Sequence, residues 1–183
     1  MTGSDPKRLV ADGYDRIAAR HAEWAATVRT QERAHHAAHL VRAFPHGGTL
    51  LELGCGTGGM TTQTLAAHFD LTGIDISAGS IDAARAAIPH ARFIVGDMAQ
   101  VDLPEASFDA VAAFYSIIHL PREEHAALFG RVARWLRPAG LFVATLGMSD
   151  NPAGYEDDWL GAPMFWSGFD RETSERCRSW CGW

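Results

Sequence analysis

The stretch LLELGCGTGGM (residues 50–60) decides the fold of this chain. An apolar run that contains one acid, Glu52, is followed by four glycines within six residues. A short apolar run that ends in glycines is typical of a buried strand, and Gly54, Gly56 and Gly59 match the G-x-G-x-x-G turn that leads from a strand into a helix. The stretch therefore predicts a turn that holds a nucleotide or a nucleoside.

An acid in the expected place supports this interpretation. Asp75 stands about twenty residues after the first glycine, as the fingerprint requires, in the second apolar run, LTGIDIS (71–77). An ionised carboxylate only accepts hydrogen bonds, so Asp75 can bind both hydroxyls of a ribose. The alternative is that Asp75 and Ser77 serve only to cap the helix that follows.

Strand and helix patterns alternate on the C-terminal side of this turn. Apolar strand patterns lie at 49–55, 71–77, 91–97, 108–116 and 140–147. Between them, one predicted helix face carries Ile81, Ala84 and Ile88, and another carries Leu128, Phe129, Val132 and Leu136. Apolar strands separated by amphipathic helices predict a doubly wound, Rossmann-like α/β fold with a mostly parallel sheet. Its ligand is expected at the carboxyl ends of the strands.

Three parts of the chain differ in pattern and are expected to pack as one domain. Residues 1–46 are predicted to form an N-terminal helical cap, with a buried stripe of Ala37, Leu40, Val41 and Phe44. Residues 47–148 are predicted to form the Rossmann-like core that binds the cofactor. Residues 149–183 are predicted to form an aromatic lid and a short helix.

Composition argues against several classes of protein. The 183 residues carry 16 basic and 22 acidic side chains, and a net charge of −6 argues against a nucleic-acid partner. No apolar run reaches membrane-spanning length and no signal peptide is recognisable, so a cytoplasmic location without membrane contact is expected. Three cysteines do not form a disulfide framework. No metal is expected, because His35, His36 and His39 with Glu32 are interpreted as a helix face.

Glu52 indicates which ligand the turn holds. In a dinucleotide enzyme the turn faces a pyrophosphate at a helix N-terminus. A carboxylate in the same crevice would disfavour that anion and suit a ligand with positive charge. S-adenosylmethionine fits, since it carries a sulfonium, an ammonium, a ribose and an adenine but no phosphate. The alternative is that Glu52 is paired with an arginine.

Several segments, in order and spacing, resemble the motifs of class I S-adenosylmethionine-dependent methyltransferases of the small-molecule type. They are LLELGCGTGGM, GIDIS, FIVGDMAQVDLP, FDAVAAFYSIIHLP and LRPAGLFVATL. The resemblance covers roughly residues 12–170. The opening YDRIAARHAEW is also similar to the N-terminal helix of that family, which caps the cofactor.

The resemblance implies a cofactor site. The residues expected around the methionine part are Glu52, Gly54, Cys55, Gly56 and Gly58, with Tyr14 closing over it. Asp75 and Ile76 are expected at the ribose. Asp97 and Met98 are expected at the adenine, where Asp97 would accept its exocyclic amine. Phe114, Tyr115 and Ser116 are expected to line the path to the methyl group.

The implied chemistry is an in-line displacement on the methyl carbon. The sulfonium already activates the methyl group, so the protein mainly orients the acceptor and excludes water. A base is needed only if the acceptor loses a proton. His119 is the best candidate by position, with Tyr115 and His21 as weaker ones; the alternative is a structural His119 in the turn before PREEH.

The segment 149–169 is rich in aromatic residues. It contains Tyr155, Trp159, Phe165, Trp166 and Phe169, more rings than a plain surface loop requires. Together with Tyr115 and His119, Trp159 and Trp166 are expected to line an apolar pocket for a small-molecule acceptor. The alternative is that these rings merely cover an edge of the sheet.

The sequence therefore predicts an S-adenosylmethionine-dependent methyltransferase. A nicotinamide-dependent oxidoreductase on the same turn is the first alternative, and Glu52 and the later motifs argue against it. A catalytically silent binding protein with the same fold is the second. The acceptor atom is not predicted.

The C-terminal stretch departs from the family that the chain resembles. That family usually continues through a helix into an antiparallel hairpin that pairs with the fifth strand. Here DRETSERCRSWCGW (170–183) is predicted to be a helix capped by Asp170, with no further strand pattern. The strand at 140–147 would then keep an open edge. A homodimer over this edge, or an aromatic tail with Cys177, Trp180, Cys181 and Trp183 folded across it, is expected.

Overall fold

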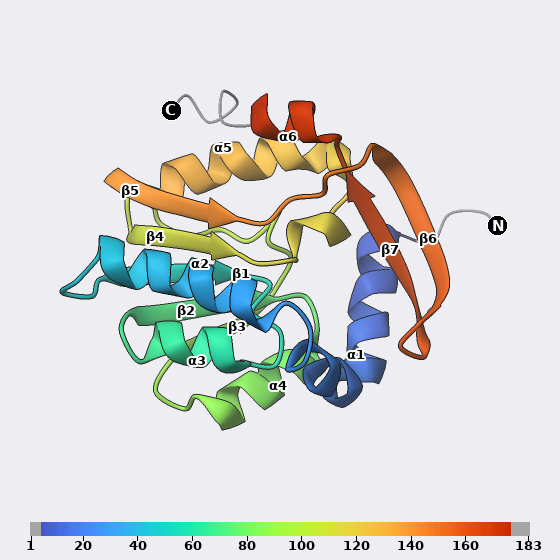
Figure 1. The fold of residues 1–183 in the computed structure, drawn as a ribbon, viewed down its shortest axis with the longest axis horizontal. Coiled ribbons are helices and arrows are strands. Elements are labelled where there is room, and N and C mark those ends of the chain that lie inside the picture. The colour runs from blue at the N-terminus through green and yellow to red at the C-terminus, as the bar shows by residue number, and fades with distance from the viewer. Residues whose placement is uncertain (1–4, 177–183) are drawn as a thin grey trace.

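Five parallel strands form the central sheet, in the order β3–β2–β1–β4–β5 (Figure 1). The computed structural model describes residues 5–176. The strands are β1 Thr49–Leu53, β2 Asp70–Asp75, β3 Arg92–Val95, β4 Phe108–Ala113 and β5 Leu136–Ala144. The strand order reverses between β1 and β4, and ligands of such sheets bind at the carboxyl ends next to this reversal. The predicted doubly wound parallel sheet is confirmed.

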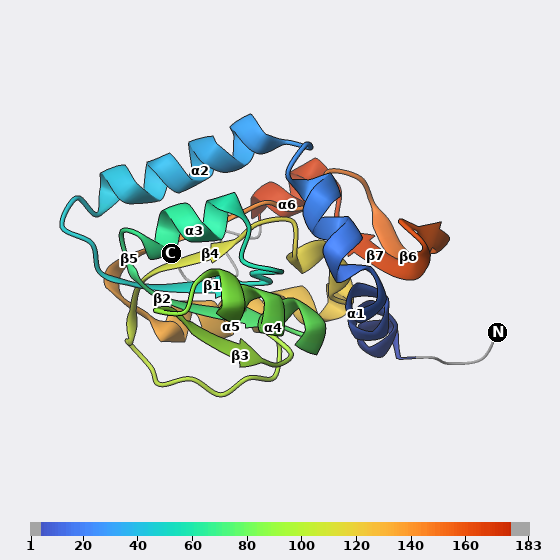
Figure 2. The same cartoon turned by 90° about the horizontal axis from the view of Figure 1, so that it is seen from below.

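Helices cover both faces of the sheet. They are α1 Pro6–Ala25, α2 Thr30–Ala43, α3 Met60–Ala66, α4 Ala78–Ala87, α5 His125–Trp135, α6 Arg171–Arg176 and the 3-10 turns η1 Ile117–His119 and η2 Arg122–Glu124. One core joins α2, α3 and α4 to the sheet, and a second core joins α5 to its other face. Figure 2 shows α2 and α3 on one side of the strands and α5 on the other.

The two cores explain the apolar run that precedes the glycine turn. Along β1, Leu50 packs into the core beneath α2 and α3, while Leu51 and Leu53 pack into the core beneath α5. All three side chains are fully buried. A strand covered on both faces needs apolar residues at successive positions, which is why the stretch does not alternate.

The junction of α5 and β5 differs from the prediction. Leu136 was expected on the helix, but α5 ends at Trp135 and Leu136 is the first residue of β5, paired with Phe108. Leu136 has an extended backbone, with φ −70° and ψ 140°. Pro138 follows two residues later, and helices usually end before a proline because its ring crowds the preceding residue. Leu136 is still buried in the core beneath α5.

The segment after β5 forms an antiparallel hairpin that the sequence analysis did not predict. It consists of β6 Asn151–Trp159 and β7 Ala162–Gly168. Leu160 and Gly161 connect them with positive φ values of 53° and 95°, as tight hairpin turns require. The acids of YEDDW in β6 are poor strand formers, which hid the element. Figure 1 shows the hairpin beside α1, beyond the carboxyl ends of the sheet.

The cap of α6 and the outer edge of β5 lie within the described residues. Asp170 caps α6 as predicted, since its Oδ1 accepts the Thr173 N–H at 2.7 Å. Within residues 5–176, β5 pairs only with β4 and keeps an open outer edge. The aromatic tail with Cys177 lies outside the described residues. Among the described helices, none is long and apolar enough to cross a membrane.

Candidate functional site

A pocket opens at the carboxyl ends of the parallel strands, beneath α1. Most residues expected at the site line it: Tyr14, Gly54, Gly56, Asp75, Ile76, Asp97, Met98, Phe114, Tyr115, Ser116 and His119. His21, a weaker candidate base, lines it as well. Residues that the sequence analysis did not assign complete the wall: Lys7, Val10, Arg33, Ile74, Gly96 and Leu120. Glu52, Cys55, Gly58, Trp159 and Trp166 are not part of the lining.

The glycines of the turn serve different purposes. Gly54 has a φ of 75°, and a Cβ on it would overlap the side chain of Ser116, so the turn and the loop after β4 approach closely only through glycine. Gly56 has a φ of 56°, and a Cβ on it would meet nothing within 4 Å. Gly58 instead faces α4, where a Cβ would lie 3.1 Å from Ala84 Cα. Gly54 and Gly56 therefore shape the pocket, while Gly58 supports the turn from behind.

Asp75 ties the glycine turn to the end of β2. Its Oδ2 accepts the N–H of Gly56 at 2.9 Å, and its Oδ1 accepts the N–H of Ser77 at 3.0 Å. Burial raises the pKa of Asp75, although these two backbone N–H groups work in the opposite direction. Ser77, not Asp75, provides the side-chain cap of α4. Each carboxylate oxygen keeps further acceptor capacity toward the pocket.

Glu52 lies behind the glycine turn and is 3% exposed. The Thr62 hydroxyl donates to its Oε1 at 3.3 Å, while Oε2 is buried without a hydrogen-bond partner among residues 5–176. The arginine pairing considered for Glu52 is not present in this part of the chain. Burial, together with the nearby charge of Asp75, raises the pKa of Glu52 to about 8, although the Thr62 hydrogen bond works in the opposite direction. A cation in front of the turn would favour the ionised carboxylate.

Asp97 lines the pocket beyond the end of β3 and is paired with a lysine. Its Oδ1 accepts the N–H of Ala99 at 2.8 Å, and its Oδ2 lies 2.7 Å from Lys7 Nζ. Lys7 also contacts Glu124 Oε2, at 2.9 Å. The carboxylate expected to meet an adenine amine is thus already paired with a lysine from the first turn of α1. Nothing in the sequence near Lys7 marked this contact.

His119 and Tyr14 form a hydrogen-bonded pair. His119 Nδ1 lies 2.9 Å from the carbonyl oxygen of Phe165, which can only accept, so Nδ1 carries the proton. The Nε2 atom, 2.8 Å from the Tyr14 hydroxyl, therefore accepts from it. Burial lowers the pKa of His119 to about 4 and raises the pKa of Tyr14. His119 is neutral near pH 7, with its basic nitrogen toward Tyr14.

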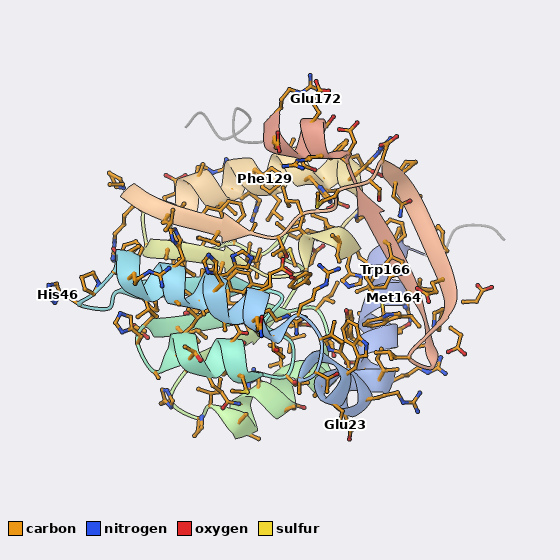
Figure 3. The ribbon with its side chains drawn as sticks, viewed as in Figure 1. Glu23, His46, Phe129, Met164, Trp166 and Glu172 are labelled. Carbon is orange, nitrogen blue, oxygen red and sulfur yellow. The ribbon has the colours of Figure 1, made fainter. Side chains whose placement is uncertain are left out.

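Trp159 and Trp166 form a layer behind this pair. The ring of Trp166 lies 4.4 Å from that of His119, and the ring of Trp159 lies 5.7 Å from that of Tyr14 (centroid distances). His21 contacts both Tyr14 and Trp159, and burial lowers its pKa to about 4. Figure 3 shows Trp166 and Met164 on the hairpin beside α1. The two tryptophans support the residues that line the pocket.

Arg33 is a pocket residue that the sequence analysis missed. Its guanidinium lies 4.9 Å from the ring centroid of Tyr115, and it donates to the carbonyl of Ala25 at 3.0 Å. No carboxylate within residues 5–176 forms an ion pair with it. Burial lowers its pKa. Tyr115 has an unusual φ of 58°, and its N–H donates to Thr145 Oγ1 at 2.5 Å, which fixes the ring beside Arg33.

One histidine of the α2 cluster makes a packing contact with the end of β4. His36 stacks on Phe114 with ring centroids 5.7 Å apart. Within the described part of the chain, no group of three or more His, Cys, Asp and Glu side chains is arranged to hold a metal ion.

Known proteins resemble this chain in sequence and in fold. A family model described as a methyltransferase domain matches residues 50–140. An uncharacterized methyltransferase of Anoxybacillus flavithermus is 31% identical over 110 residues, covering 60% of this chain and 52% of the relative. The solved DhpI–SAH complex has a TM-score of 0.75 at 24% identity, covering 98% of this chain and 89% of that chain. SAM-bound CalS10, an amino pentose methyltransferase from Micromonospora echinaspora, has a TM-score of 0.70 at 22% identity, covering 91% and 87%.

The fold and the pocket first define a class, the Rossmann-like α/β proteins that bind a ligand at the reversal of strand order. Residues 50–140 match the methyltransferase-domain family model, and the resemblance to class I S-adenosylmethionine-dependent methyltransferases is confirmed. The likeness to the solved structures establishes the fold. The chain spans about half the length of its Anoxybacillus relative.

Proposed function

We propose that the chain is an S-adenosylmethionine-dependent methyltransferase that transfers a methyl group to a small-molecule acceptor by in-line displacement. One observation carries this proposal. Asp75 and Asp97 line the pocket at the ends of β2 and β3, and Glu52 is buried near the end of β1, next to the glycine turn. Asp75, and Glu52 once a bound cation favours its ionised form, suit a ligand with a sulfonium, an ammonium and ribose hydroxyls, and they disfavour a pyrophosphate. The match of residues 50–140 to the methyltransferase-domain family model supports the same assignment.

Two features of the pocket fit this cofactor. Glu52 Oε2 is a buried acceptor without a partner among residues 5–176, and such an atom is stabilised by a donor such as an ammonium. In front of Gly56, open space remains where a side chain would otherwise stand. The turn can therefore approach a ligand with its backbone, and Glu52 provides the charge behind it.

The remaining contacts follow from the positions of the side chains. Arg33, a cation without a carboxylate partner in the described part, would bind the carboxylate of the methionine part. Asp75 and Ile76 would hold the ribose, and Asp97 and Met98 the adenine. Around the methionine part, Tyr14 would cover the site, while Cys55 and Gly58 would shape the turn without touching the ligand.

The bound cofactor supplies a methyl carbon that its sulfonium charge has already activated. The residues of the chain then need to orient an acceptor and exclude water. Phe114, Tyr115 and His119 line the approach. His119 Nε2 can take up a proton that the acceptor loses, provided that the Tyr14 hydroxyl turns away from it. Because its pKa is about 4, His119 is deprotonated at neutral pH but is a weak base there, so it can hold such a proton only briefly before passing it on.

The acceptor end of the pocket favours a small, partly apolar molecule. Trp159 and Trp166 back the Tyr14–His119 pair without lining the pocket, so they restrict its size. This sharpens the expected role of the aromatic segment: it closes the acceptor pocket from outside and leaves the direct contacts to Tyr115 and His119.

Calorimetry with S-adenosylmethionine, S-adenosylhomocysteine and NADH tests the proposal. We expect binding of both sulfur compounds and none of NADH. Binding of NADH alone would favour the oxidoreductase and end the proposal. Transfer of a labelled methyl group to a panel of small amines, phenols and hydroxy acids tests turnover. Tight cofactor binding without transfer to any acceptor would favour the silent binding protein.

A homodimer through the open edge of β5 is a further part of the proposal. Strand edges pair with other strands because their backbone N–H and C=O groups are unpaired. We expect a dimer in light scattering, and a monomer at high concentration would contradict it. A cytoplasmic location, as expected from the sequence, stays a prediction.

A further inference from the structure

Lys7 is the only lysine in the chain; the other fifteen basic residues are arginines. Lysine side chains normally extend into solvent, because burying an ammonium costs free energy unless it is paired. The side chain of Lys7 is 13% exposed and lines the pocket. The single lysine therefore lies at a position where its ammonium needs a partner of opposite charge.

Two carboxylates form ion pairs with this ammonium. Lys7 Nζ lies 2.7 Å from Asp97 Oδ2 and 2.9 Å from Glu124 Oε2. Asp97 belongs to the pocket, whereas Glu124 lies in η2, outside the lining. A compact ammonium can donate to both, while a planar guanidinium would need more room. Burial opposes the charge, but the two carboxylates raise the pKa of Lys7 above its ordinary value.

The helix that carries Lys7 also carries Tyr14. Lys7, Val10, Tyr14 and His21 all line the pocket, at spacings that place them along one face of α1. Seven residues of helix separate Lys7 from Tyr14 by about 10 Å. One end of α1 thus lies at Asp97, and the next turns reach the Tyr14–His119 hydrogen bond. A rigid helix transmits a displacement at Lys7 to Tyr14.

We propose that Lys7 is a positioning residue that fastens α1 across the pocket by bridging Asp97 and Glu124, and so holds Tyr14 against His119. The inference rests on the proposed function for its role in methyl transfer, because Tyr14 and His119 are the residues placed at the acceptor. In the protein without cofactor, we expect that breaking the bridge between Lys7 and its two carboxylates exposes His119.

The pKa of His119, followed by NMR of the imidazole resonances, measures this connection. His119→Gln identifies the resonance. In Lys7→Met, we expect the pKa of His119 to rise from about 4 toward its ordinary value of 6.5, because Tyr14 no longer covers the ring. Glu124→Gln leaves the pocket lining intact and weakens only the outer half of the bridge. We expect a smaller rise in the same direction there.

Arg8→Met is the matched control. Arg8 is the neighbour of Lys7 on α1, its side chain is 82% exposed, and it pairs with Asp12 at 3.8 Å on the outside of the helix. The substitution removes one positive charge from the same turn without touching the bridge. We expect the pKa of His119 to stay at about 4. A pKa that is unchanged in both Lys7→Met and Glu124→Gln overturns the proposal, as does an equal rise in Arg8→Met.

Cofactor binding gives an independent measurement. In Lys7→Met, the affinity for S-adenosylhomocysteine should fall about tenfold, or about 1.4 kcal/mol, because α1 and Tyr14 no longer cover the cofactor site. Glu124→Gln should lower it less, and Arg8→Met should leave it unchanged. If the wild-type protein does not bind S-adenosylhomocysteine, the proposed function fails, but the titration of His119 still decides whether Lys7 fastens α1. A normal affinity in Lys7→Met combined with an unchanged His119 pKa would refute the inference altogether.

Discussion

The two ends of the pocket are built in different ways. The glycine-turn end consists of strand ends and tight backbone turns, in which Gly54 approaches Ser116 and Asp75 accepts the N–H of Gly56. The acceptor end consists of side chains from α1 and the β6–β7 hairpin, which meet at Tyr14, His119 and the aromatic layer. The first is made by short-range geometry, the second by contact between segments far apart in the sequence.

The glycine-turn end is therefore expected to be rigid, and the acceptor end to be more tolerant of substitution. Backbone turns that cross closely tolerate almost no substitution, so the glycine-turn end is rigid. The acceptor end is a packed layer of rings, and its shape depends on which side chains fill it. We therefore expect the two ends to respond differently to substitution and to pH.

The largest effect is expected from Gly54→Ala. The new Cβ would overlap Ser116, and the φ of 75° disfavours any residue with a side chain. We expect a loss of about 3 kcal/mol or more in the free energy of unfolding, together with loss of S-adenosylhomocysteine binding. Chemical denaturation and calorimetry measure both. Stability within about 0.5 kcal/mol of the wild type would show that the turn is not rigid.

Acid should weaken the acceptor end. Since the pKa of His119 is about 4 in the folded protein and near 6.5 when unfolded, the unfolded chain binds more protons between these values. This contribution to stability is present above pH 6.5 and is lost as the pH falls to 4, on the order of 3 kcal/mol in total. His119→Gln should flatten this part of a stability–pH profile. A profile with the same slope in the variant would contradict the neutral, buried His119.

The glycine-turn end should respond in the opposite direction. Burial raises the pKa of Glu52 to about 8, from 4.5 when unfolded, so its contribution is present below pH 4.5 and declines as the pH rises toward 8. Glu52→Gln should remove this decline, so that the variant gains stability relative to the wild type between pH 5 and about 8. Denaturation in the absence of ligand at several pH values measures it. A parallel pair of profiles would contradict the buried position of Glu52.

Asp75→Ala tests the ribose contact at the same end. A hydrogen bond to a charged group contributes about 1.5–3 kcal/mol, so the affinity for S-adenosylhomocysteine should fall about tenfold or more. The affinity of Asp75→Asn should lie between those of the wild type and Asp75→Ala, because the amide keeps one acceptor oxygen. Trp166→Phe, at the acceptor end, is the control and should leave this affinity unchanged. Unaltered affinity in a folded Asp75→Ala protein would refute the assignment.

The smallest effect compares two glycines inside helices. Alanine is favoured over glycine by about 1 kcal/mol in a helix. On Gly130 of α5 a Cβ would meet nothing within 4 Å, so Gly130→Ala should stabilise the protein by about 0.5–1 kcal/mol. On Gly13 of α1 a Cβ would lie 2.9 Å from the Pro163 carbonyl oxygen. Gly13→Ala should therefore destabilise it by about 1 kcal/mol in thermal unfolding. An equal change in stability in Gly130→Ala and Gly13→Ala would show that α1 is not held closely against β7.

The sequence predicted the glycine-turn end because its signals are local. Apolar runs that end in glycine or acid give the strands, and their common carboxyl edge brings Asp75 and Asp97 to one side. Residue roles at this end remain predictions, but the placement of Gly54, Gly56 and Asp75 at the pocket follows from the parallel sheet. At the opposite edge of the sheet, the prediction that Leu136 belongs to the helix was wrong, because helical spacing competed with the nearby Pro138.

The acceptor end was predicted only in outline. An excess of aromatic residues indicated a lid, but no periodic pattern showed that YEDDW is a strand or that β7 packs on α1. Arg33 and Lys7 lie in helices whose sequence carries no sign of the pocket. Their positions depend on how α1 and α2 cross the strand ends, which is determined by packing across the whole chain.

The pairing of α1 with the hairpin also bears on how the protein is synthesised. Residues 6–25 leave the ribosome well before residues 151–168, and every strand of the central sheet is made in the interval. Val10 and Ile17 of α1, which pack against Met164 and Phe165, must wait for these partners. Contacts of such large sequence separation form late in folding. The nascent chain can therefore complete its sheet and glycine turn first, and the end of the pocket that faces the acceptor is assembled last.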